Sequence, residues 1–248
     1  MYDVVATRNT PALVIYLIDI SGSMAEPLDG ARKIEHVEDA IERVVNKMVQ
    51  RSTRGELIAP RYRIAMIAYT DDPIDVLGGV LTIDQVAQRG KLKLTPNHLT
   101  NTDKAFAVAR DILHQELPKL ADCPAPMVCH LTDGDYTGAD PSPIAHEIMQ
   151  MSNADGNVLV ENIYVGADLT EQPIGDLHTW PGLLEERELK SPQARKLFTM
   201  SSELPASYAD VIGDDGYALR PGSRMLMPGT NRDLIQLAFA MSGATPTR

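Results

Sequence analysis

The stretch that decides the fold is Leu13-Val14-Ile15-Tyr16-Leu17-Ile18, followed directly by Asp19-Ile20-Ser21-Gly22-Ser23. A short, unbroken apolar run is typical of a strand buried on both faces, the position of a central strand in a parallel sheet. The carboxylate of Asp19 and the hydroxyls of Ser21 and Ser23 then emerge at the carboxyl end of that strand, where open α/β sheets bind ligands. Three hard oxygen donors so close together favour a hard divalent cation such as Mg²⁺.

Strand and helix patterns alternate along the rest of the chain. The expected strands cover residues 13–19, 62–70, 74–81, 127–132, 157–165 and 224–227. The expected helices cover residues 33–51, 103–117, 143–152, 191–201, 205–212 and 231–241. Segment 74–81, interrupted by Gly78-Gly79, is expected as an antiparallel edge strand. The alternation predicts an α/β fold that is doubly wound and Rossmann-like, with a mostly parallel central sheet, one antiparallel edge strand and helices on both faces.

Composition restricts the classes of partner. The chain has 248 residues, 34 of them acidic and 23 basic, and a net charge of −11, which argues against nucleic acid and anionic lipid as partners. No stretch approaches the roughly 20 apolar residues of a membrane span, and the N-terminus does not read as a signal peptide. We interpret Cys123 and Cys129 as free thiols and expect a cytoplasmic protein.

Three loops at strand ends or before helices carry the candidate site. The first supplies Asp19, Ser21 and Ser23, the second Thr100 and the third Asp133. Mg²⁺ prefers octahedral oxygen coordination, and neutral hydroxyl ligands leave most of its charge uncompensated. An ion held in this way keeps a position at which an Asp or Glu carboxylate of a protein partner can bind. An acidic protein could thereby capture an acidic partner.

In these loops the chain resembles a von Willebrand factor type A (VWA) domain with a metal-ion-dependent adhesion site (MIDAS). The family motif Asp-x-Ser-x-Ser is met by Asp19-Ile20-Ser21-Gly22-Ser23. A threonine before a helix, followed by alanine and an apolar residue, is met by Thr100 with Ala105-Phe106. A Thr-Asp-Gly turn after an apolar strand is met by Thr132-Asp133-Gly134. The order of the motifs along the chain also agrees.

The resemblance implies the role of each site residue. Ser21 and Ser23 would bind the metal directly, Thr100 would do so in the ligand-bound form, and Asp19 and Asp133 would act through water or as supporting acceptors. The ion would be Mg²⁺, with Mn²⁺ or Ca²⁺ as alternatives. Asn97-His98-Leu99 stands where the family has glycines before the threonine, which leaves Thr102 as a rival to Thr100.

The resemblance also bears on domain organisation. It covers a single VWA domain over residues 11–241, followed by a flexible tail at residues 242–248. The stretch 167–221 is longer than a minimal domain of this family needs, and we expect an insertion there.

The resemblance implies a metal-dependent protein-binding module, a scaffold or adaptor within a multi-protein complex. One alternative is a metal-dependent phosphohydrolase with Asp19 as nucleophile. Such enzymes usually carry a second acid two residues further on, and Ser21 occupies that position. Neither a nucleophile elbow nor a phosphate-binding glycine motif occurs, so we expect no enzyme activity. The other alternative is a structural VWA domain with an unused site, in which Asp and Ser simply cap the following helical turn.

Overall fold

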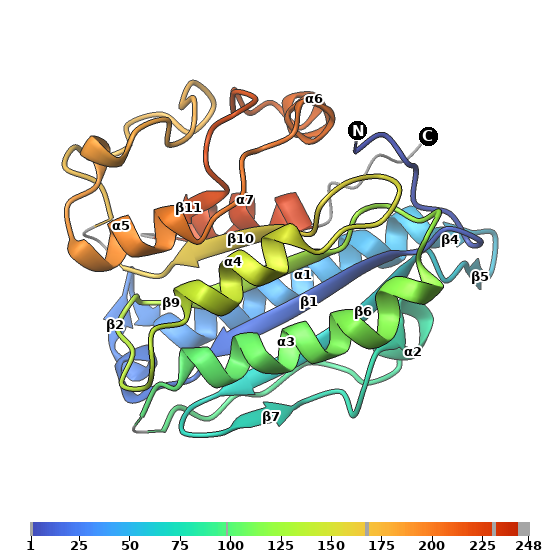
Figure 1. The fold of residues 1–248 in the computed structure, drawn as a ribbon, viewed down its shortest axis with the longest axis horizontal. Coiled ribbons are helices and arrows are strands. Elements are labelled where there is room, and N and C mark those ends of the chain that lie inside the picture. Colours follow the sequence, from blue (N-terminus) through green and yellow to red (C-terminus); the bar gives the residue numbers. More distant parts are fainter. Residues whose placement is uncertain (1, 98, 167–168, 230–231, 243–248) are drawn as a thin grey trace.

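The computed structural model describes residues 2–97, 99–166, 169–229 and 232–242. Its centre is a seven-stranded sheet with the order β11-β10-β9-β1-β6-β7, in which β8 also pairs with β6 (Figure 1). The parallel strands are β1 (Ala12–Asp19), β6 (Tyr62–Tyr69), β9 (Met127–Thr132), β10 (Leu159–Tyr164) and β11 (Leu226–Pro228). The antiparallel strands, both paired with β6, are β7 (Pro73–Asp75) and β8 (Leu81–Thr82). The expected mostly parallel sheet with an antiparallel edge is confirmed.

Strand β1 lies between β6 and β9, parallel to both, and all of its residues are buried. Side chains alternate between the faces of a strand, so β1 contributes to two cores. Val14, Tyr16 and Ile18 enter one core, and residues 13, 15 and 17 enter the other. The expectation of a central strand buried on both faces is therefore correct.

Helices cover both faces of the sheet. The core that holds Tyr16 also takes side chains from α1 (Lys33–Ser52), α2 (Ile83–Ala87), α6 (Ala206–Asp214) and α7 (Arg232–Ser242). The opposite core takes them from α3 (Thr102–Glu116) and α4 (Ser142–Gln150), which lie on the near side of the sheet in Figure 1. The amphipathic pattern predicted α1, α3 and α4 to within a few residues of their ends.

The sheet edge differs from the prediction in one respect. The segment expected as one strand over residues 74–81 forms two short strands, because Gly78 and Gly79 have φ angles of +75° and +119° between them. These left-handed conformations turn the chain away from the ladder. Helix α2 follows β8 and was not anticipated. Two small hairpins were also not anticipated, β2 (Pro27–Leu28) with β3 (Ala31–Arg32) and β4 (Thr53–Arg54) with β5 (Leu57–Ile58).

The chain between β10 and β11 includes α5 (Pro192–Thr199) and α6. Apolar side chains of residues 169–198 form a separate cluster with Tyr164 and Leu226, whereas those of α6 join the core that holds Tyr16. Ser191 caps α5 as expected, because its hydroxyl accepts a hydrogen bond from the Ala194 backbone N–H at 3.1 Å. The extent of an insertion over residues 167–221 stays a prediction. The expected tail at 242–248 lies outside the described residues except for Ser242, which ends α7. The expected helix start at Asn231 also lies outside the described residues.

Both cysteines are free thiols, as expected, and both are buried. Among the described residues, no helix combines the length and the apolar composition needed to cross a membrane.

Candidate metal centre

Asp19 ends β1 and is fully buried. One carboxylate oxygen, Oδ1, accepts a hydrogen bond from the Ser21 backbone N–H at 2.8 Å, and the other, Oδ2, accepts one from the Thr132 hydroxyl at 2.9 Å. Asp19 therefore ties the loop after β1 to the end of β9. Burial raises the pKa of Asp19 to about 7 and the negative charge of Asp133 adds to the rise, while the Ser21 and Thr132 hydrogen bonds counteract it. A nearby cation would stabilise the charged form of this carboxylate.

The two serines of the first loop lie side by side. Ser21 precedes the short 3₁₀ helix η1 (Gly22–Ala25), and its Oγ is 3.1 Å from Oγ of Ser23. Adjacent ligands of an octahedral Mg²⁺ with bonds of about 2.1 Å are about 3.0 Å apart. The spacing of the two hydroxyls thus fits neighbouring positions on such an ion.

The second loop runs between the first and the third. The Asn97 backbone N–H donates to the carbonyl oxygen of Ile20 at 2.8 Å, and Asn97 forms an isolated parallel bridge with Ser21. Thr100 is buried, and its carbonyl oxygen accepts a hydrogen bond from the Thr137 backbone N–H at 2.8 Å. The backbone of this loop is therefore fixed to the Ser21 loop on one side and to the chain after Asp133 on the other.

Thr102, the rival to Thr100, is the first residue of α3 and is also buried. Its hydroxyl interacts with the buried hydroxyl of Tyr69, whose pKa it helps to lower against the large rise caused by burial. The hydroxyl of Thr102 thus has a partner in the core. The choice of Thr100 as ligand stays a prediction that this contact favours.

Asp133 follows β9 and carries a contact that the sequence did not predict. Its Oδ2 lies 3.2 Å from Nζ of Lys33, whose ammonium also pairs with Glu26 at 2.9 Å. Both side chains of the Lys33–Asp133 pair are about one-tenth exposed. Burial lowers the pKa of Lys33, but the two carboxylates more than offset this and leave it above its ordinary value. The site therefore contains a fixed positive charge next to one of its carboxylates.

These donors are all oxygen atoms, which suits a hard divalent cation rather than a soft one. Across the described part of the chain, no group of three or more His, Cys, Asp or Glu side chains could hold a metal, so a cation at this site depends on the hydroxyls. Hydrogen bonds and charges link Asp19, Ser21, Ser23 and Asp133 within one site. The ligation of one ion by these residues together with Thr100 stays a prediction.

The fold of this chain is similar to that of several solved structures. Proximal thread matrix protein 1 from the mussel byssus matches with a TM-score of 0.57 and 13% identity, over 97% of this chain and 47% of that one. Solved VWA domains are also among the matches, including that of SpRpn10 (TM-score 0.45, 13% identity, 62% of this chain and 74% of that chain). The chain has the fold of a VWA domain.

A further match to this VWA fold is the vWF domain of the pilus tip protein Mfa5 from Porphyromonas gingivalis (TM-score 0.39, 24% identity, 52% of this chain and 40% of that chain). Proximal thread matrix protein 1 has also been solved with zinc in its MIDAS motif. The chain spans less than half the length of the Mfa5 and thread matrix structures it matches. No family model and no curated protein matches the sequence.

Proposed function

We propose that this VWA domain is a divalent-metal-dependent protein-binding module that captures an Asp or Glu carboxylate of its partner. The proposed metal residues are Asp19, Ser21, Ser23, Thr100 and Asp133. The observation that carries the proposal is the Ser21–Ser23 hydroxyl pair, 3.1 Å apart beside the buried carboxylate of Asp19. Mg²⁺ is the proposed ion, with Mn²⁺ and Ca²⁺ as alternatives.

Each residue has a separate task in this proposal. Ser21 and Ser23 would hold the ion through neutral oxygens, and Thr100 would join them when a partner is bound. Asp19 would keep the serine loop in place through the bond from the Ser21 N–H, and Asp133 would add negative charge close by. When bound, the ion would supply a Lewis-acidic position for one oxygen of the partner's carboxylate. The positive charge of the bound ion would offset the repulsion expected between an acidic partner and a chain of net charge −11.

The contacts of Asp19 support binding rather than catalysis. Both of its oxygens accept hydrogen bonds from within the protein, from the Ser21 N–H and the Thr132 hydroxyl. A nucleophilic carboxylate would need one oxygen directed at substrate. Phosphatase assays of the wild-type protein and of Asp19→Asn distinguish the two functions, because phosphoester turnover lost in the variant would favour the phosphohydrolase.

The proposal is tested by titrating Mg²⁺ into the wild-type protein and into Ser21→Ala plus Ser23→Ala in a calorimeter. We expect binding to the wild type, about a hundredfold weaker or undetectable binding to the double variant, and unchanged binding to Ser152→Ala, an exposed serine elsewhere. Wild-type protein that binds no divalent ion would refute the metal site. Affinity capture with Mg²⁺ and with EDTA then identifies partners, which should be lost with the double variant and retained with Ser152→Ala.

A further inference from the structure

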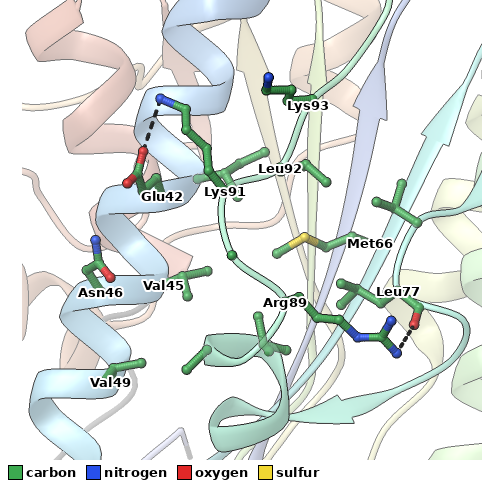
Figure 2. Close-up of a pocket in the computed structure, with 15 residues that line it drawn as sticks. Glu42, Val45, Asn46, Val49, Met66, Leu77, Arg89, Lys91, Leu92 and Lys93 are labelled. Carbon is green, nitrogen blue, oxygen red and sulfur yellow. Dashed lines mark hydrogen bonds and ion pairs between the residues drawn. The ribbon is translucent and has the colours of Figure 1, made fainter.

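A pocket of about 440 Å³ lies between helix α1 and the segment that follows α2 (Figure 2). Residues 88–94, which we call the strap, connect the end of α2 with the loop that leads to Thr100. None of the proposed metal residues lines the pocket. Its volume falls in the range of small-molecule sites, about 300–1,000 Å³.

The floor of the pocket is apolar, and Glu42 and Asn46 of α1 add polar groups to its wall. Ile41 and Val45 of α1, Met66 of β6 and Leu77 of the loop after β7 line it together with Val86 of α2. Ile41, Met66, Leu77 and Val86 belong to the buried core, and Val45 packs against it. A ligand in this pocket would therefore bury its own apolar surface against a floor that the fold has already built.

Acidic side chains of α1 hold the strap in place. Nζ of Lys91 lies 2.8 Å from Asp39 and 3.1 Å from Glu42, and the Leu94 backbone N–H donates to Glu38. Figure 2 shows Lys91 reaching across from the strap to Glu42 on α1. The charge of Lys91 is thus neutralised by two carboxylates, so Lys91 supports the pocket rather than attracting a ligand.

Two further cations of the strap line the pocket without such compensation. Arg89 donates to a neutral acceptor, the carbonyl oxygen of Leu77, at 3.3 Å. Neither Arg89 nor Lys93 forms an ion pair with any residue that the structure describes. Figure 2 shows the two at opposite ends of the pocket, Arg89 beside Leu77 and Lys93 beyond Leu92, so each offers a separate positive charge in a chain of net charge −11.

We propose that this pocket binds a small carboxylate with an aliphatic body, whose chain lies against Val45 and Met66 and whose charge faces Arg89. The apolar floor disfavours inorganic anions, and Arg89 favours an acid over the corresponding alcohol. The proposal is independent of the metal site.

The test ligand is octanoate. Two control ligands each keep one part of it: 1-octanol has the aliphatic chain but no negative charge, and acetate has the carboxylate but no aliphatic chain. All titrations are done in EDTA, which separates the result from metal binding. Methyl NMR spectra of the full chain should show octanoate-dependent shifts at Ile41, Val45 and Met66, with 1-octanol about tenfold weaker and acetate without effect. Equal binding of octanoate and 1-octanol, or shifts confined to other methyl groups, would overturn the proposal.

Variants separate the two halves of the ligand. Arg89→Gln should weaken octanoate about tenfold and leave 1-octanol unchanged. The charge-matched controls, Lys93→Gln at the other end of the pocket and Arg54→Gln at an exposed position, should change neither affinity. Val45→Phe should fill the pocket and weaken both ligands, and thermal unfolding confirms that this variant folds. Unchanged octanoate binding to folded Val45→Phe would exclude the pocket as the site.

Discussion

Replacing Glu161 with Gln should remove a large part of the pH dependence of stability. Glu161 lies in the middle of β10, fully buried, opposite Cys129 on β9. Neither of its carboxyl oxygens has a hydrogen-bond partner of good geometry among the residues that the structure describes. Burial raises its pKa from an ordinary 4.5 to about 8, and the Cys129 thiol counteracts the rise only in part. The folded protein therefore holds this carboxyl protonated at neutral pH.

The sign and size of the effect follow from the two pKa values. Between pH 4.5 and about 8 the folded state binds the Glu161 proton and the unfolded state releases it, so stability falls as the pH rises. Within this range the free energy of unfolding falls by about 1.4 kcal/mol for each pH unit. Relative to its value below pH 4.5, it is therefore lower by about 3 kcal/mol at pH 7. His130 acts in the opposite sense, because burial lowers its pKa from 6.5 to about 4 and stability falls as the pH drops through that range. The window from pH 6.5 to 8 thus isolates Glu161 from His130.

The assay is urea unfolding of the wild-type protein, Glu161→Gln and Glu161→Leu at several pH values in this window. The wild-type free energy of unfolding should fall by about 2 kcal/mol more than that of either variant across the window. The Asp19 contribution is common to all three proteins and cancels in the difference. Glu161→Gln leaves a polar amide in the core, which could itself change the stability. Glu161→Leu controls for this effect, because it removes the titrating carboxyl group without placing another polar group there. Equal slopes in all three proteins would show that Glu161 is charged in the fold and would refute the reasoning.

Three further predictions concern the site and its surroundings. Lys33→Met removes the cation beside Asp133 and should tighten Mg²⁺ binding by roughly tenfold in calorimetry, whereas weaker binding would show that Lys33 mainly positions Asp133. Gly134→Ala should lower both the melting temperature and the Mg²⁺ affinity. Gly134 has a φ of +99°, which disfavours alanine, and an added Cβ would lie 2.7 Å from the Tyr164 ring. An unchanged melting temperature and affinity would show that the loop relaxes freely. Ser191→Ala removes the cap of α5 and should cost about 1 kcal/mol in urea unfolding while Mg²⁺ affinity stays the same.

The parts of the fold that the sequence predicted are those with a local cause. The apolar run before Asp19 indicated a central strand because burial on both faces leaves no polar position, and β1 is buried throughout. The 3.6-residue period in the same way located α1 and α3. The division of segment 74–81 into two strands has no such local cause. It depends on pairing with β6, because β7 and β8 pair with different parts of that strand on either side of the turn at Gly78-Gly79.

The chemistry of the site was less accessible to sequence reasoning than its motif. Lys33 was missed because its long side chain has many rotamers, and only the position of Glu26 and Asp133 decides where the ammonium lies. Glu161 did leave a signal, since two polar residues, Glu161 and Asn162, interrupt the apolar pattern of this strand. For the acidic residue, the interruption indicates either a position at the sheet edge or a buried carboxyl with a perturbed pKa. Only the strand order, which places β10 between β9 and β11, distinguishes the two.

The ion pair at Asp133 has a consequence for how metal affinity would be set. In the absence of metal, the Lys33 ammonium reduces the repulsion between Asp133 and the buried carboxylate of Asp19. A divalent ion would add positive charge where one cation already lies, so part of its attraction to Asp133 is offset by repulsion from Lys33. Lys33 can keep a favourable contact with Glu26 if it releases Asp133, because that carboxylate is 2.9 Å away. Tight metal binding would then require the Lys33–Asp133 ion pair to break. Glu26 would lower the free-energy cost of this step, because it keeps the Lys33 ammonium paired.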